Sequence, residues 1–81
     1  MEIKLIGFSE EAWNVYSDAV EVEQAIFGRV NDLIDEIRNN GGPNTKDYYD
    51  EDRDEYQRSF ENGHSIIYRL SHEKVSIEKI I

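Results

Sequence analysis

The chain contains no cysteine, few basic residues and no long hydrophobic run. The lack of cysteine excludes a disulfide framework, a thiol nucleophile and a thiolate zinc site. No apolar run reaches the roughly 18 residues needed to cross a bilayer, and the first residues lack the basic and apolar regions of a signal peptide. We therefore expect a soluble, cytoplasmic protein without a membrane partner, and no motif calls for a metal or another cofactor.

The shortage of basic residues limits the possible partners. There are 18 Asp and Glu against 9 Lys and Arg, which gives a net charge of −9. Proteins that grip nucleic acid neutralise phosphates with clustered Lys and Arg, so this charge disfavours direct binding to RNA or DNA. It favours a basic protein partner instead. The alternative is that the acidity only keeps a small protein soluble.

The pattern of apolar residues predicts one α+β domain spanning residues 1–81. Residues 2–7 alternate as a strand does, and Ser9 has the character of an N-cap for a first helix, with Phe8 and Trp13 spaced as a hydrophobic staple. A second helix ends near Arg38, and no clear boundary separates it from the first. Gly28 inside this helix indicates a close approach to a neighbouring element.

The second half of the chain predicts a loop followed by three strands. Residues 40–55 have no period and should form an exposed loop, whereas residues 56–61, 64–70 and 74–81 are strand-like and Asn62-Gly63 is a hairpin signal. The order is β-α-α-β-β-β, an antiparallel sheet with two helices packed on one face and the N-terminal strand antiparallel to a late strand. The expected core consists of Ile3, Leu5, Trp13, Tyr16, Ile26, Val30, Leu33, Ile34, Ile37, Ile66, Tyr68 and Ile77.

Five segments resemble the RelE/YoeB family of type II toxin-antitoxin systems. They are Lys4-Leu5-Ile6, Ser9-Glu10-Glu11-Ala12-Trp13 with Tyr16, Asn31-Asp32-Leu33-Ile34-Asp35, Tyr56–Arg58 and His64-Ser65-Ile66-Ile67-Tyr68. The resemblance implies a RelE/YoeB-like fold, which agrees with the order of elements above. It also implies a ribosome-dependent mRNA endoribonuclease that is silenced by an antitoxin.

The residues that such toxins use for cleavage are replaced in this chain. Asn44 stands where the resemblance places the general base, and an amide cannot accept the proton. Ser65 stands where the resemblance places the phosphate-binding arginine. The chain ends Glu78-Lys79-Ile80-Ile81 where the resemblance places the histidine that acts as general acid. A shifted loop register would offer Asp47, Asp50 or Glu51 as the base.

Four further side chains are possible substitutes for the missing catalytic groups. Arg58 is a weak candidate cation, and alternation allows it to share a sheet face with Arg69. The alternative is that both are ordinary cross-strand partners. His64 and His72 are alternatively surface histidines, and two histidines so placed make no metal site.

The favoured function is that of a non-catalytic, toxin-fold protein that binds a basic partner. The partner would be an antitoxin, a toxin or a nucleic-acid-binding protein, and an inhibitor carried by a phage or mobile element is one version. The alternatives are an active mRNA endoribonuclease toxin and a decayed gene product. The expected binding surface combines the loop and the second helix: Asp32, Asp35, Glu36, Asp47, Tyr48, Tyr49, Asp50, Glu51 and Asp52, with the remaining loop acids to Glu55.

Overall fold

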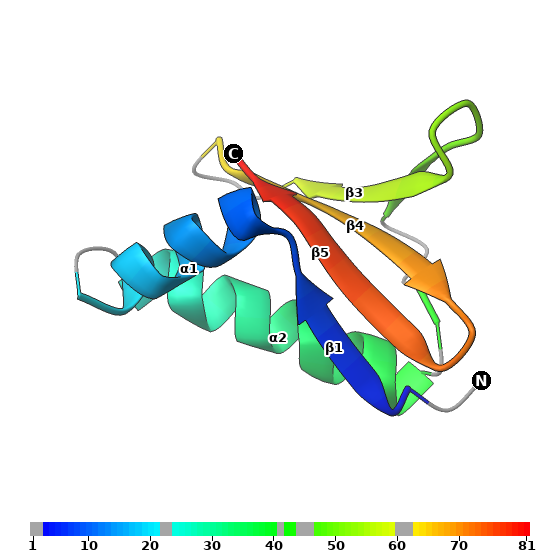
Figure 1. Cartoon of the computed structure of the whole chain (residues 1–81), viewed down its shortest axis with the longest axis horizontal. Helices are drawn as coiled ribbons and strands as arrows, with labels where there is room; N and C mark the ends of the chain where they lie inside the picture. The colour runs from blue at the N-terminus through cyan, green and yellow to red at the C-terminus, as the bar shows by residue number, and fades with distance from the viewer. Residues whose placement is uncertain (1–2, 22–23, 41, 44–46, 60–62) are drawn as a thin grey trace.

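Two helices lie on one face of a five-stranded sheet (Figure 1). The computed structural model describes residues 3–21, 24–40, 42–43, 47–59 and 63–81, without the side chains of 19–21 and 24–27. The elements are β1 (Leu5–Phe8), α1 (Glu10–Glu21), α2 (Gln24–Asn40), β2 (Tyr48–Asp50), β3 (Glu55–Ser59), β4 (Ser65–Ser71) and β5 (Lys74–Ile80). The predicted α+β class with both helices on one face is confirmed.

The sheet has the strand order β1-β5-β4-β3-β2, and its four later strands are antiparallel neighbours. The N-terminal strand β1 pairs in parallel with β5, with Leu5 opposite Lys74 and Phe8 opposite Ile77. The prediction of antiparallel pairing for this strand was wrong. The spacing of apolar residues identifies a strand but carries no information on its direction, and the intervening helices permit a parallel return.

The start of α1 is built as the sequence predicts. The Ser9 hydroxyl oxygen accepts a hydrogen bond from the Ala12 amide at 3.0 Å, which satisfies a free donor of the first turn. The same hydroxyl donates to the Glu78 carbonyl at 2.6 Å and so ties the helix start to β5. Phe8 and Trp13 form the staple, with ring centroids 5.5 Å apart.

The core lies between the helices and the covered sheet face. Its buried residues are Ile3, Ala12, Val30, Leu33, Ile34, Ile37, Ile66, Tyr68, Val75, Ile77 and Ile80, with Tyr16 partly buried against them. Most of the predicted core is therefore confirmed, and the side chain of Ile26 lies outside the described part. The four residues from α2 recur at helical spacing, which is why this stripe was readable in the sequence.

Three predictions about packing were wrong. Leu5 is 61% exposed. Ile6 and Phe8 lie on the covered face of β1, and because side chains alternate along a strand, Leu5 lies on the opposite face. Trp13 is 52% exposed and packs by its edge on Phe8 rather than entering the core. A Cβ on Gly28 would meet no atom of the described residues within 4 Å, so no close approach among them requires this glycine.

The acidic middle segment is only partly irregular. Residues 48–50 form β2, which pairs antiparallel with β3, and residues 51–54 form the exposed turn between them. The prediction of an uninterrupted loop was wrong here. In the predicted Asn62-Gly63 turn, Asn62 lies outside the described residues, and Gly63 has the positive φ of 86° that a glycine permits. Of the helices described, neither is long and apolar enough to span a membrane.

Candidate functional site

The β2–β3 hairpin presents most of the predicted partner-binding residues. Its turn carries Glu51 and Asp52, both exposed, and projects away from the helices and the rest of the sheet (Figure 1). Tyr48 is 68% exposed and Tyr49 is 40% exposed. The two tyrosines are consecutive residues of one strand, so their side chains lie on opposite faces of the hairpin. They therefore cannot contact one flat partner surface together.

Side chains hold the turn in one conformation. One carboxylate oxygen of Asp50, Oδ1, accepts hydrogen bonds from the amides of Asp52 at 3.0 Å and Arg53 at 3.3 Å. The Tyr49 hydroxyl donates to Asp54 at 2.7 Å, and the Tyr49 ring lies 4.8 Å from that of Tyr56. Asparagine and aspartate favour turns by such bonds to the backbone. The hairpin is thus organised before any partner arrives.

The hydrogen bond from Tyr49 to Asp54 should be detectable in the titration of Tyr49. The bond to Asp54 favours the neutral phenol and raises the pKa of Tyr49 to about 12. Because the unfolded value is about 10, this bond stabilises the fold fully below that pH, and its contribution is lost as the pH rises through the folded-state pKa. Asp54→Asn should lower the pKa of Tyr49 toward its ordinary value, measured by NMR titration of each tyrosine. Asp52→Asn is the control and should leave it unchanged; equal titration curves for wild type and Asp54→Asn would contradict the assignment.

Asp47 does not belong to the exposed acidic surface. Its side chain is fully buried and accepts hydrogen bonds from the Arg58 guanidinium and from the Tyr68 hydroxyl. The expectation that Asp47 is an exposed loop acid was therefore wrong, because its carboxylate is buried and paired with an arginine. Asp47 was predicted to be exposed because it lies in the same acidic segment as its exposed neighbours.

Arg58 of β3 is the centre of an ionic cluster that joins α2, β3 and the residue just before β2. Its side chain is 12% exposed and contacts Asp47, which precedes β2, and Glu36 of α2, whose Oε2 lies 2.7 Å from Nη1. The short contact with Glu36 thus brings a second carboxylate against the same guanidinium. Desolvation opposes the charge on Arg58, but the two carboxylates outweigh it and raise the pKa of Arg58 above its ordinary value. Burial, with the bond to Asp47, also raises the pKa of Tyr68.

The two arginines of the sheet face opposite ways. Arg58 is paired with Ile66 across β3 and β4, so it lies on the helix-covered face, whereas Arg69 alternates with the buried Tyr68 and lies on the open face. The expectation that they share a face was wrong. Arg69 is half exposed and its Nε lies 3.9 Å from Glu55, an ordinary cross-strand pair.

The acids of α2 form a second, separate group. Asp32 and Asp35 are exposed on this helix, while Glu36 is occupied by Arg58. The hairpin turn points away from α2 (Figure 1). The structure therefore divides the expected binding surface into an acidic hairpin and a smaller acidic patch on the helix.

Ser65 lies where the resemblance places a phosphate-binding arginine, and it is neutral and engaged. Its hydroxyl is 3.4 Å from the Gln57 amide nitrogen and 3.3 Å from the Ser59 hydroxyl. Its backbone pairs with that of Ile81 through two hydrogen bonds. The start of β4 and the end of β5 therefore meet, as a site made from these two segments requires. Asn44 lies outside the described residues.

The histidines are not brought together as a metal site. His64 Nδ1 lies 3.0 Å from the Ile81 carbonyl, and His72 is in the turn between β4 and β5, 3.7 Å from Glu73. Within the described part of the chain, no group of three or more His, Asp or Glu side chains is placed to hold a metal ion.

This arrangement of five strands and two N-terminal helices is the fold of the RelE/YoeB-like toxins. A YoeB/ParE toxin from Agrobacterium tumefaciens matches with a TM-score of 0.82 and 13% identity over 95% of each chain. A chain of the YoeB-YefM complex from Staphylococcus aureus matches with a TM-score of 0.81 and 19% identity, over 99% of this chain and 95% of that one. No protein-family model and no curated protein matches the sequence. The predicted RelE/YoeB-like fold is confirmed, and at these identities the likeness establishes the fold alone.

Sequence reasoning missed β2 and the cluster around Arg58. The signal for β2 was present, since Tyr48 and Tyr49 are strong strand formers placed just before a run of turn-forming aspartates. The cluster left no local signal, because Glu36, Asp47 and Arg58 are separated by 11 residues at each step along the chain.

Proposed function

We propose that this protein is a non-catalytic, toxin-fold protein that acts by binding a basic protein partner. The observation that carries the proposal is the projecting, preorganised hairpin whose exposed turn is acidic. An acidic surface fixed in one geometry attracts a basic surface over distance and loses little entropy on binding. The net charge of −9 has the same sign and extends the attraction beyond the hairpin.

The environment of Arg58 supports the non-catalytic part of this proposal. An arginine that stabilises a phosphate must be free to approach it, and Arg58 is already neutralised by Asp47 and Glu36 on the covered face. Ser65 provides no charge at the position where the resemblance places the phosphate-binding group. The partner class we favour is an antitoxin, a toxin or a nucleic-acid-binding protein with a basic segment. One similar structure is that of a YoeB-YefM complex, so a chain of this fold does assemble with a second protein.

An mRNA endoribonuclease is the second candidate, and one observation favours it. Arg69, Lys74 and Lys79 lie on the open face of β4 and β5, on which phosphates would find positive charge. Capture of partners by the immobilised protein, followed by salt elution, separates the two. A basic protein released by salt supports the proposal, whereas recovery of ribosomes or mRNA alone supports the endoribonuclease.

Salt and charge should control the association rate of the captured partner. We expect the on-rate to fall several-fold between low salt and physiological salt, where the Debye length is about 8 Å. Replacing Asp50, Glu51 and Asp52 with Asn, Gln and Asn should lower the on-rate several-fold at low salt, measured by surface plasmon resonance. Asp32→Asn with Asp35→Asn is the control on α2, and it removes two charges where the hairpin variant removes three. A larger effect from the helix pair, or an on-rate indifferent to salt, would move the binding surface away from the hairpin.

A further inference from the structure

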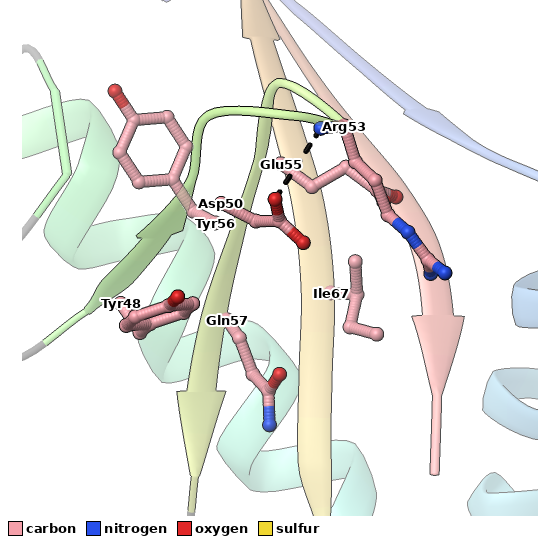
Figure 2. Close-up of a pocket in the computed structure, with 7 residues that line it drawn as sticks. All are labelled: Tyr48, Asp50, Arg53, Glu55, Tyr56, Gln57 and Ile67. Atoms are coloured by element: carbon pink, nitrogen blue, oxygen red, sulfur yellow. Dashed lines mark hydrogen bonds between the residues drawn. The ribbon is translucent and has the colours of Figure 1, made fainter.

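A pocket lies on the open face of the β2–β3 hairpin and combines an aromatic wall, an apolar floor and polar groups. Tyr48, Asp50, Glu55, Gln57 and Ile67 line it together with Arg53 from the turn (Figure 2). Tyr56 also lines the pocket, and Figure 2 shows its ring directed away from the other labelled side chains. We propose that this pocket receives an arginine side chain of the basic partner, an inference that rests on the proposed function.

The aromatic wall is the first part of the argument. Tyr48 is 68% exposed, more than any other large apolar or aromatic side chain in the described part of the chain, and among the described residues its hydroxyl makes no hydrogen bond and its ring no aromatic contact. A guanidinium stacks on an aromatic face through cation–π attraction and its flat shape, and it is less strongly hydrated than an ammonium. The exposed Tyr48 face therefore suits arginine better than lysine.

The acceptors are the second part. Asp50 is held by its Oδ1, which accepts two backbone amides, so Oδ2 remains for a ligand. The Gln57 nitrogen is directed to Ser65 at 3.4 Å, which leaves its carbonyl oxygen as an acceptor. Glu55 adds a second carboxylate, held only weakly by Arg69 at 3.9 Å. An arginine presents five donors in one plane and so can satisfy several of these acceptors together.

The floor distinguishes a side chain from a small cation. Ile67 lies on β4 beside Gln57, with which it is paired, and offers apolar surface to the methylene groups of an arginine stem. A metal ion would gain nothing from Ile67 or from the Tyr48 ring, and an anion would be repelled by two carboxylates. A basic side chain with an apolar stem can contact the Tyr48 ring, Ile67 and the carboxylates at once.

The chain's own Arg53 lines the same pocket and reduces its negative charge. No ion pair of the Arg53 side chain occurs among the described residues, and Figure 2 shows its guanidinium on the far side of Ile67 from Tyr48. A cation in this position repels an incoming arginine. Removing it should therefore strengthen binding, a direction opposite to the usual effect of mutating a binding pocket.

The test is an NMR titration of the whole, isotope-labelled protein with the peptide acetyl-Gly-Arg-Gly-amide. We expect saturable shifts confined to residues 48–57 and Ile67, and no such shifts with the citrulline analogue, which has the same shape without the charge. Tyr48→Ala should weaken binding about two- to fivefold, the range of an exposed cation–π contact. Tyr48→Phe should retain it, and Arg53→Gln should tighten it. Shifts centred on α2, no saturable shifts, or equal binding of the citrulline peptide would overturn the proposal.

The outcomes also separate this inference from the proposed function. If the captured partner responds to salt and to the acidic triple replacement but Tyr48→Ala and Arg53→Gln change nothing, the pocket is not the arginine site and the proposed function stands. If the peptide binds the pocket as expected but no basic protein is captured, the proposed function fails and the arginine site stands. Far-ultraviolet circular dichroism of each variant confirms that it is folded.

Discussion

Replacing Arg58 with alanine should remove much of the stability of the protein, about 3–5 kcal/mol. The change leaves the Asp47 carboxylate fully buried without its guanidinium, and the desolvation of that charge is then no longer compensated. A domain of 81 residues has a typical free energy of unfolding of about 4–12 kcal/mol. We therefore expect Arg58→Ala to unfold at a clearly lower urea concentration than the wild-type protein.

Arg69→Ala is the matched control, because it removes an arginine from the same sheet. Arg69 is half exposed and its pair with Glu55 spans 3.9 Å, so the expected loss is below about 1 kcal/mol. Glu36→Gln should fall between the two, since the Glu36 side chain is 44% exposed although the Oε2 that contacts Arg58 is buried. Urea denaturation followed by circular dichroism measures all three. Equal losses for Arg58→Ala and Arg69→Ala would show that burial does not decide the cost.

The parts of the fold that the sequence predicted are those in which a local rule and the packing agree. The α2 stripe of Val30, Leu33 and Ile37 has the period of a helix, and the same residues are buried. The cap at Ser9 is likewise a local rule, because its hydroxyl needs only the first turn of the helix. Both predictions were confirmed in the structure.

The parts that the sequence did not predict depend on distant partners. The direction of β1 is decided by β5, some 70 residues later, and the exposure of Leu5 follows from that register. Asp47 looked like one more acid of an exposed loop, although Arg58 and Tyr68 bury it. The predicted binding surface therefore included one residue that is buried, and it assumed that two tyrosines on opposite faces of the hairpin act together.

The absence of mRNA cleavage is the second large effect that we expect. Cleavage of RNA through its 2′-hydroxyl needs a base, a cation for the developing phosphorane and an acid for the leaving oxygen. The resemblance places these at Asn44, Ser65 and the C-terminal residues, none of which has the required chemistry, and Ser65 and Ile81 do lie side by side. Loss of an acid or base commonly costs about 10²–10⁴ in rate, and loss of an oxyanion donor about 10²–10³.

We therefore expect cleavage at least about 10²-fold slower than that of an active toxin of this fold. This factor corresponds to the loss of one group, because the effects of groups that act together are not additive. Programmed ribosomes are incubated with the purified protein, and cleaved mRNA is detected by primer extension beside a cleaving toxin as the positive control. Ser65→Arg should remain inactive, because one restored cation supplies neither the base nor the acid. Cleavage by the wild-type protein that approaches the positive control would favour the endoribonuclease, and Arg69, Lys74 and Lys79 on the open face would then be the first cations to replace.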